Sequence, residues 1–131
     1  MIERYSRPQM KRVWADKNKY DKWLHVQLAV CQAWTEEGVI PKSDFDLLSS
    51  ATYDPDVFEN ELKQTRHEMA AFLASITHNL GDEGRWLHLG LTTSDVWDTA
   101  TSLQMIDAIE IIEIEIEKLI QALKEKALEL V

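Results

Sequence analysis

Residues 94–131 read SDVWDTATSLQMIDAIEIIEIEIEKLIQALKEKALELV, and this stretch decides the fold class. No glycine or proline interrupts it. Its apolar residues recur three or four positions apart, which is the spacing of one helical face. They are Leu103, Ile106, Ile109, Ile112, Ile116, Leu119, Leu123, Ala127 and Leu130. The stretch therefore predicts one helix of about 35 residues, roughly 50 Å long at 1.5 Å per residue.

Within this stretch, residues 109–117 (IEIIEIEIE) alternate apolar and acidic side chains locally, as a β-strand would. A strand of that length needs turn residues at both ends, and the flanking sequence has none. Ile111 and Ile114 widen the apolar arc beyond one stripe. Nothing earlier in the chain is long enough to cover such an arc. We therefore expect its packing partners in another chain or in missing sequence.

The rest of the chain is also helical in pattern, because its few glycines and prolines fall between long periodic segments. We predict helices over residues 6–14, 20–37, 43–50 and 54–81, followed by a loop over residues 81–91. Ser6 is expected to cap the first helix, whose inward residues are Met10, Val13 and Trp14. Gly38 is expected to close the second helix, and Asp54 to cap a fourth that runs unbroken. The predicted fold class is all-α.

Composition excludes several classes of protein. The chain has 14 Lys+Arg against 23 Asp+Glu, and its net charge of −9 would repel a nucleic-acid backbone. Cys31 is the single cysteine, which excludes a disulfide framework and a cysteine-based zinc cluster and favours a reducing compartment such as the cytoplasm. The charged start MIERYSRPQMKR does not fit a signal peptide. No apolar run approaches the ~18 residues that span a bilayer.

Three local groups suit a small anionic ligand. In the first, Arg4 and Tyr5 combine a guanidinium with a phenol, although an ordinary charged N-terminus has the same residues. In the second, Arg66, His67 and Glu68 bring a cation, an imidazole and a carboxylate together in the middle of the predicted fourth helix. The alternative for this group is a partly buried histidine that is simply hydrogen-bonded.

The third group, Thr92 and Thr93, precedes the long helix. Thr92 and Asp95 have the spacing of a capping box, while consecutive hydroxyls and helix-start N–H groups also suit an anion. Capping alone would explain these residues, so both interpretations stay open. A metal centre is not predicted, because Ala71 stands where the H-E-x-x-H pattern beginning at His67 requires its second histidine.

Three segments carry a family resemblance: IERYSRPQM at 2–10, QTRHEMAAF at 64–72 and HLGLTTSDVWDTA at 88–100. In order and spacing they resemble the amino-terminal region of the adenylosuccinate lyase family, within the fumarase/aspartase superfamily. The resemblance continues through KEKAL at 124–128. It implies a small helical domain over 1–93, the first long helix of a central bundle over 94–131, and a homotetramer. It also implies that the 131 residues are a truncated piece of a longer chain.

The resemblance further implies a carbon–nitrogen lyase of purine biosynthesis. Such an enzyme releases fumarate by β-elimination from adenylosuccinate, giving AMP, and from succinyl-aminoimidazole-carboxamide ribotide, with no cofactor and no metal. By position, Arg4 and Tyr5 match contacts to the nucleotide phosphate. Thr92 and Thr93 match contacts to the succinyl carboxylate.

The remaining matched residues are Arg66, His67 and Glu68, which the resemblance assigns to substrate binding, with His67 also supporting the acid–base machinery. Glu68 replaces the commoner Asp of the family, and Thr93 replaces the commoner Ser. The family's main general-acid histidine and base serine lie downstream of Val131, so the 131 residues alone are expected to be inactive.

Two alternatives stay open from the sequence. One is another fumarate-releasing lyase such as argininosuccinate lyase, which Arg4 and Tyr5 disfavour because that substrate has no phosphate. The other is a non-catalytic helical interaction module that keeps only the family's scaffold.

Overall fold

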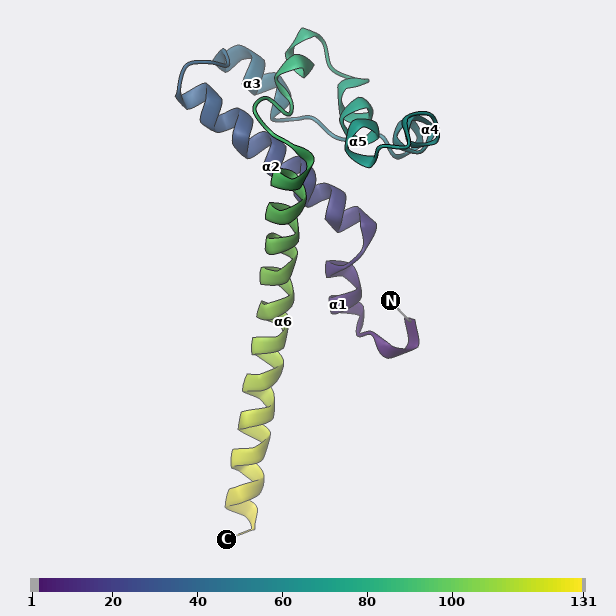
Figure 1. The fold of residues 1–131 in the computed structure, drawn as a ribbon. Helices are drawn as coiled ribbons and strands as arrows, with labels where there is room; N and C mark the ends of the chain where they lie inside the picture. The colour runs from purple at the N-terminus through teal and green to yellow at the C-terminus, as the bar shows by residue number, and fades with distance from the viewer. Residues whose placement is uncertain (1–2, 131) are drawn as a thin grey trace.

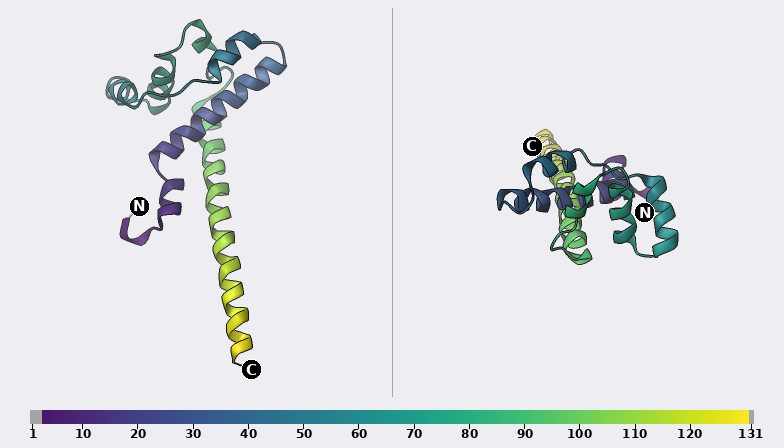
Figure 2. Two further views of the ribbon diagram at one scale, coloured as in Figure 1. Left: turned by 180° about the vertical axis from the view of Figure 1, so that it is seen from behind. Right: turned by 90° about the horizontal axis from the view of Figure 1, so that it is seen from above.

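The computed structural model describes residues 3–130 and consists of helices joined by short loops (Figure 1). In chain order the elements are η1 (Glu3–Tyr5), α1 (Pro8–Val13), α2 (Asp16–Glu36), α3 (Lys42–Leu48), α4 (Pro55–Thr65), α5 (Glu68–Thr77), η2 (Asp82–Trp86) and α6 (Thr93–Glu129). Helices α2 to α5 and η2 gather into a head, from which α6 extends as a long arm (Figures 1 and 2). Residues 3–130 contain no strand, so the all-α prediction is confirmed.

Helix α6 has 37 residues and confirms the prediction made from residues 94–131. It begins after Thr92, whose backbone N–H donates to the Asp95 carboxylate at 2.7 Å, as the capping-box spacing predicts. Its first part packs against α2 and α1, with one buried residue about every turn. These residues are Val96, Ala100, Gln104 and Ala108. A stripe with a period of four positions is the face that one crossing helix covers.

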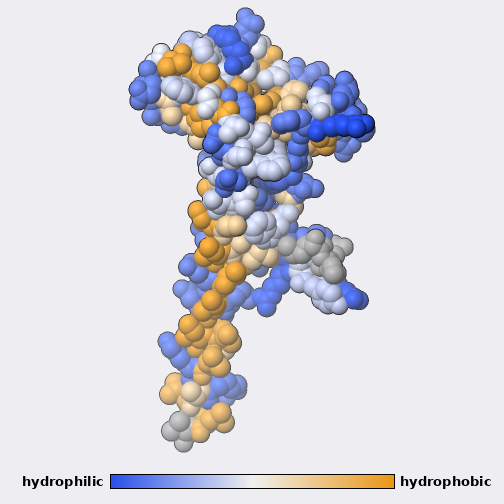
Figure 3. All heavy atoms as spheres, viewed as in Figure 1, coloured by the Kyte–Doolittle hydropathy of each residue, from blue (hydrophilic) through white to orange (hydrophobic). Residues whose placement is uncertain are grey.

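Beyond Ala108, α6 leaves the head and its apolar arc lies open. The exposed fractions of Ile109, Ile116 and Leu123 are 52%, 49% and 60%. Figure 3 shows the resulting hydrophobic band running down the arm. Within residues 3–130, no element covers this band along its length, as the sequence predicts. None of the described helices is both long and apolar enough to cross a membrane.

The segment predicted as one helix over 54–81 is two helices, α4 and α5, and that prediction is wrong. Asp54 does cap α4, because its carboxylate accepts the backbone N–H groups of the next turn at 2.9 and 3.1 Å. The helix stops at Arg66, which has a left-handed backbone (φ 51°), and His67 then caps α5 with an extended backbone (φ −129°). Arg66 and His67 therefore lie at a helix junction and not in mid-helix.

The first helices also differ from the prediction in detail. Arg7 and not Ser6 is the N-cap of α1, with Pro8 as the first helical residue. Val13 is buried as expected, but Trp14 is 41% exposed. Helix α2 begins at Asp16, four residues before the predicted start, and ends where expected, with a left-handed glycine at 38 (φ 76°).

The core of the head is aromatic and joins three helices. Tyr20 of α2 has its ring centroid 4.8 Å from that of Phe58 on α4 and 5.8 Å from that of Phe72 on α5. Trp23 meets Phe72 edge to face, with the ring centroids 5.3 Å apart. Each such ring pair is worth roughly 0.5–1.5 kcal/mol beyond the burial of its area. This packing fixes the start of α5 against α2.

Candidate functional site

His67 occupies the junction between α4 and α5 as a helix cap. Its ring Nδ1 accepts the backbone N–H of Ala70 at 3.2 Å. A neutral imidazole that accepts at Nδ1 carries its proton on Nε2. His67 and the neighbouring Arg66 are both exposed. The junction therefore presents an Nε2–H donor and a guanidinium at the surface of the head, which is suitable for an anionic ligand.

Glu68 follows directly but is engaged within the head. Its carboxylate accepts hydrogen bonds from Lys19 Nζ at 2.7 Å and from the Tyr20 hydroxyl at 2.8 Å, both on α2. Burial raises the pKa of Glu68, but these hydrogen bonds and the charge of Lys19 lower it more, so the net shift is downward. The charged carboxylate therefore ties the first turn of α5 to α2.

His88 also belongs to this region, although no local pattern in the sequence marks it as a site residue. It lies in the loop before α6 with a left-handed backbone (φ 66°), which is uncommon for a residue with a side chain. Burial lowers the pKa of His88, with Asp95 opposing that shift and His67 reinforcing it. Both groups therefore lie close enough to act electrostatically on the His88 ring. Residues at the starts of α5 and α6 therefore both act on one imidazole.

One face of α2 holds the loop that carries His88. Gln27 contacts both the backbone and the ring of His88, at 3.0 and 2.9 Å. The Cys31 thiol lies 3.6 Å from the Trp86 carbonyl oxygen, and the Trp34 indole N–H donates to the Leu89 carbonyl at 3.1 Å. Gln27, Cys31 and Trp34 stand four and three positions apart, so they lie on the same face of the helix. Three successive contacts therefore fix residues 86–89.

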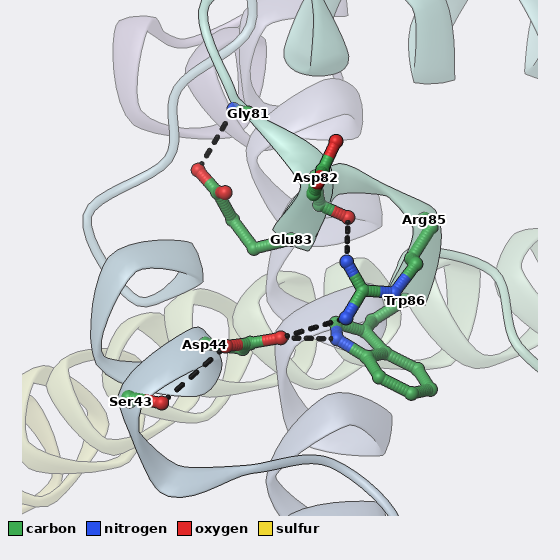
Figure 4. A network of polar contacts seen from close by, with 7 residues as sticks. All are labelled: Ser43, Asp44, Gly81, Asp82, Glu83, Arg85 and Trp86. Atoms are coloured by element: carbon green, nitrogen blue, oxygen red, sulfur yellow. Dashed lines mark hydrogen bonds and ion pairs between the residues drawn. The ribbon is translucent and has the colours of Figure 1, made fainter.

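Helix α3 also contacts this part of the chain, through Asp44 (Figure 4). The Asp44 carboxylate accepts the indole N–H of Trp86 at 2.8 Å and a guanidinium N–H of Arg85 at 3.1 Å. The Arg85 guanidinium lies over the Trp86 ring, 4.6 Å from its centroid, and also donates to the Asp82 carbonyl at 2.6 Å. In the same figure, Glu83 accepts the Gly81 N–H at 2.9 Å. The segment predicted as a loop over 81–91 is therefore a well-anchored turn of 3-10 helix followed by the His88 bend.

Arg4 and Tyr5 lie outside this region, in η1 near the middle of α6. The Arg4 guanidinium lies 4.7 Å from the centroid of the Tyr5 ring, and Tyr5 is 72% exposed. Tyr5 lines an open apolar groove of about 720 Å³ against residues 111–119 of α6. At 1.5 Å per residue, that part of α6 lies roughly 30–40 Å along the helix from Thr92. Within one chain, the structure does not bring Arg4 and Tyr5 to the other predicted site residues.

Four predicted site residues lie at helix starts or at a helix junction: Arg66 and His67 between α4 and α5, and Thr92 and Thr93 where α6 begins. Thr92 is exposed and Thr93 half-buried at the start of α6. Among residues 3–130, no group of three or more His, Cys, Asp or Glu side chains could hold a metal ion. The arrangement offers hydroxyls, a guanidinium and imidazole N–H donors, which together can hold a carboxylate in the charged state.

Comparison with known proteins assigns this helical chain to a lyase family. A family model described as "Lyase" matches residues 3–131, so the chain belongs to that family. It is 42% identical over 130 residues to the adenylosuccinate lyase of Bacillus subtilis, covering 98% of this chain. It is 45% identical over 129 residues to the adenylosuccinate lyase of Synechocystis sp., covering 97% of this chain. The chain spans 30% of the length of each of these two relatives.

A solved structure shares the fold. It is a fumarate lyase from Mesorhizobium sp. BNC1, with a TM-score of 0.73 and 21% sequence identity. The match covers 82% of this chain and 26% of the other. The family resemblance drawn from the three sequence segments is confirmed by these matches.

Proposed function

We propose that this chain forms the amino-terminal part of the active centre of an adenylosuccinate lyase. The observation that carries the proposal is the sequence identity of 42% and 45%, across nearly the whole chain, to two proteins of that name. The whole protein would be a carbon–nitrogen lyase of purine biosynthesis that needs no cofactor. It would release fumarate by β-elimination from adenylosuccinate, giving AMP, and from succinyl-aminoimidazole-carboxamide ribotide. A nucleotide substrate and a single cysteine suit the cytoplasm as its location.

The succinyl end of the substrate would bind between the starts of α5 and α6. The effects of His67 and Asp95 on the pKa of His88 support this placement, because these two residues belong to the starts of α5 and α6. The hydroxyls of Thr92 and Thr93 would donate to one succinyl carboxylate. Arg66 and His67, exposed at the neighbouring junction, would contact the substrate from the other side.

In the reaction, a base removes the proton next to a carboxylate, and negative charge develops on that carboxylate. The carbon–nitrogen bond then breaks as the leaving nitrogen takes up a proton, and the carbon–carbon double bond of fumarate forms. Donors that already point at the carboxylate stabilise this charge without reorganisation. In this chain that role falls to Arg66, Thr93 and the Nε2–H of His67. The general acid and base themselves are proposed to lie in sequence after Val131. Glu68 would contribute by holding α5 in place through Lys19 and Tyr20.

A contact from Arg4 and Tyr5 to the nucleotide phosphate requires a second copy of the chain. The groove that Tyr5 lines is roughly 30–40 Å along α6 from Thr92, which is too far for one small ligand to span. The open apolar band of α6 provides the surface on which copies would pack. We therefore propose a homo-oligomer, and specifically a homotetramer, in which one site takes residues from more than one copy.

The test is a chimera in which this chain replaces the matching part of the Bacillus subtilis relative. Fumarate release from adenylosuccinate is followed by ultraviolet absorbance. We expect turnover, and we expect Thr93→Val to lower kcat/KM by roughly 10-fold or more, since a hydrogen bond to a charged group is lost. Thr99→Val, at an exposed position on the same helix, is the matched control and should change kcat/KM by less than about twofold. A folded, tetrameric chimera without turnover would contradict the proposal.

A further inference from the structure

Gln27 and His88 form a two-point contact that no assigned role uses. Gln27 lies on α2 and is completely buried (0% exposed). Its side-chain carbonyl Oε1 accepts the backbone N–H of His88 at 3.0 Å. Its amide nitrogen Nε2 lies 2.9 Å from ring Nδ1 of the same residue. A fully buried polar side chain that makes two hydrogen bonds to one residue constrains both the backbone and the ring of that residue.

The backbone contact determines which way the Gln27 amide points. A backbone N–H can only donate, so the Gln27 atom facing it must be the carbonyl oxygen. The NH₂ group is then the atom next to His88 Nδ1, and since NH₂ only donates, Nδ1 must accept. The second amide hydrogen is directed to the Met69 sulfur, with an N···S distance of 3.8 Å. Every hydrogen-bonding group of the amide is therefore used, and only one assignment satisfies them all.

We propose that Gln27 is a positioning residue that holds His88 in the neutral tautomer with its proton on Nε2. In this state the ring offers Nε2–H as a hydrogen-bond donor to the site and does not act as a base at Nδ1. The tautomer follows from the contacts of Gln27 alone. Its use toward the succinyl group rests on the proposed function.

The same contact opposes protonation of His88. An imidazolium would place an N–H on Nδ1 directly against the NH₂ of Gln27, and a hydrogen bond would become a donor–donor repulsion. The charged groups acting on the ring are Asp95 at the start of α6, which favours the charged form, and His67 at the start of α5, which disfavours it. Burial also lowers the pKa of His88. Burial and both charged groups therefore act on a ring whose Nδ1 already accepts a hydrogen bond from Gln27.

Nitrogen-15 NMR of the imidazole rings of this chain tests the proposal. In the wild-type protein at neutral pH, we expect His88 to show a protonated Nε2 and an unprotonated Nδ1. In Gln27→Glu, a carboxylate oxygen replaces the NH₂ and accepts from Nδ1. We expect this variant to move the proton of the neutral ring to Nδ1 and to raise the His88 pKa by about one unit or more.

Gln32→Glu is the control, because it adds the same charge at an exposed position on the same helix. It should leave the tautomer unchanged and shift the His88 pKa by only a small fraction of the Gln27→Glu effect. A wild-type His88 protonated on Nδ1 would overturn the proposal even if Gln27→Glu does not fold. So would a folded Gln27→Glu protein with unchanged tautomer and pKa. None of these readouts uses lyase activity, so they are independent of the chimera assay.

Discussion

The Asp44 carboxylate accepts the indole N–H of Trp86 at 2.8 Å and so joins α3 to the loop that carries His88. The same oxygen also accepts from Arg85, 41 residues away in sequence. One acidic side chain on the seven-residue helix α3 thus links this helix to η2, which lies about 40 residues later in the sequence.

Removing that carboxylate should destabilise the protein. Asp44→Ala leaves the half-buried indole N–H of Trp86 without its acceptor, which should lower the free energy of unfolding by about 1–3 kcal/mol. Urea unfolding followed by tryptophan fluorescence measures this. Asp46→Ala is the matched control, since Asp46 lies on the same helix and its carboxylate pairs with the exposed Lys42. The control should cost less than about 1 kcal/mol, and equal losses in the two variants would contradict the linking role of Asp44.

Glu68 should make stability depend on acidic pH. Its folded-state pKa lies below the ordinary 4.5, so it stabilises the fold above about pH 4.5 and loses that contribution as the pH falls through the lower folded-state value. Glu68→Gln should therefore be less stable than the wild type near neutral pH, with the difference shrinking on acidification to about pH 3.

The measurement is the free energy of unfolding in urea across that pH range. Glu59→Gln, at an exposed position on α4, serves as the comparison and should follow the wild-type curve closely. A Glu68→Gln difference that stays constant with pH would show that the ion pair with Lys19 does not account for the shift.

At Arg66 we expect the backbone conformation to lower stability, while the side chain is proposed to bind substrate. Its left-handed backbone (φ 51°) strains any side chain with a Cβ, by roughly 1–2 kcal/mol, and glycine adopts it freely. Arg66→Gly should therefore raise or maintain the melting temperature, although glycine loses more entropy on folding. By contrast, Lys63→Gly within α4 should lower stability by about 1 kcal/mol. If Arg66 binds substrate, the Arg66→Gly chimera should be stable and yet lose most of its kcat/KM. A clear loss of stability in Arg66→Gly would argue against strain at this position.

The open band of α6 should drive self-association. Sedimentation of the wild-type chain should show concentration-dependent oligomers, because the exposed apolar area is continuous along the arm. Ile112→Lys with Ile116→Lys should abolish them. Glu113→Gln with Glu117→Gln changes the charge equally at exposed neighbouring positions and should leave association intact. A wild-type chain that stays a compact monomer at high concentration would refute the prediction.

Strong local signals in the sequence predicted α6 and the Asp54 cap correctly. The long helix could be predicted because no glycine or proline interrupts its apolar spacing. The Asp54 cap could be predicted because Asp54 precedes a proline at the first helical position. The break at Arg66 could not be predicted, since neither glycine nor proline marks it and the apolar spacing of α4 continues into α5 in the sequence. A histidine cap at position 67 is outside the usual set of capping residues.

The site was only partly predictable for a related reason. Thr92 and Thr93 could be proposed from the sequence because a helix start has a local pattern. The pairing of Gln27 with His88 joins residues 61 positions apart, and no local pattern indicates it. The inward direction of Glu68 likewise depends on Lys19 and Tyr20 on another helix. Tertiary packing decided these contacts, and a single sequence does not reveal it.

The interruption at Arg66 has an electrostatic consequence. Because the chain ends one helix there and begins another, α5 gains its own N-terminus, with His67 as its cap. Aligned peptide dipoles give such an end roughly half a positive elementary charge. The N-terminal ends of α5 and α6 both act on the His88 ring, because His67 and Asp95, which shift its pKa, belong to these two ends. A chain with a formal net charge of −9 therefore keeps two positive dipole ends in one small region.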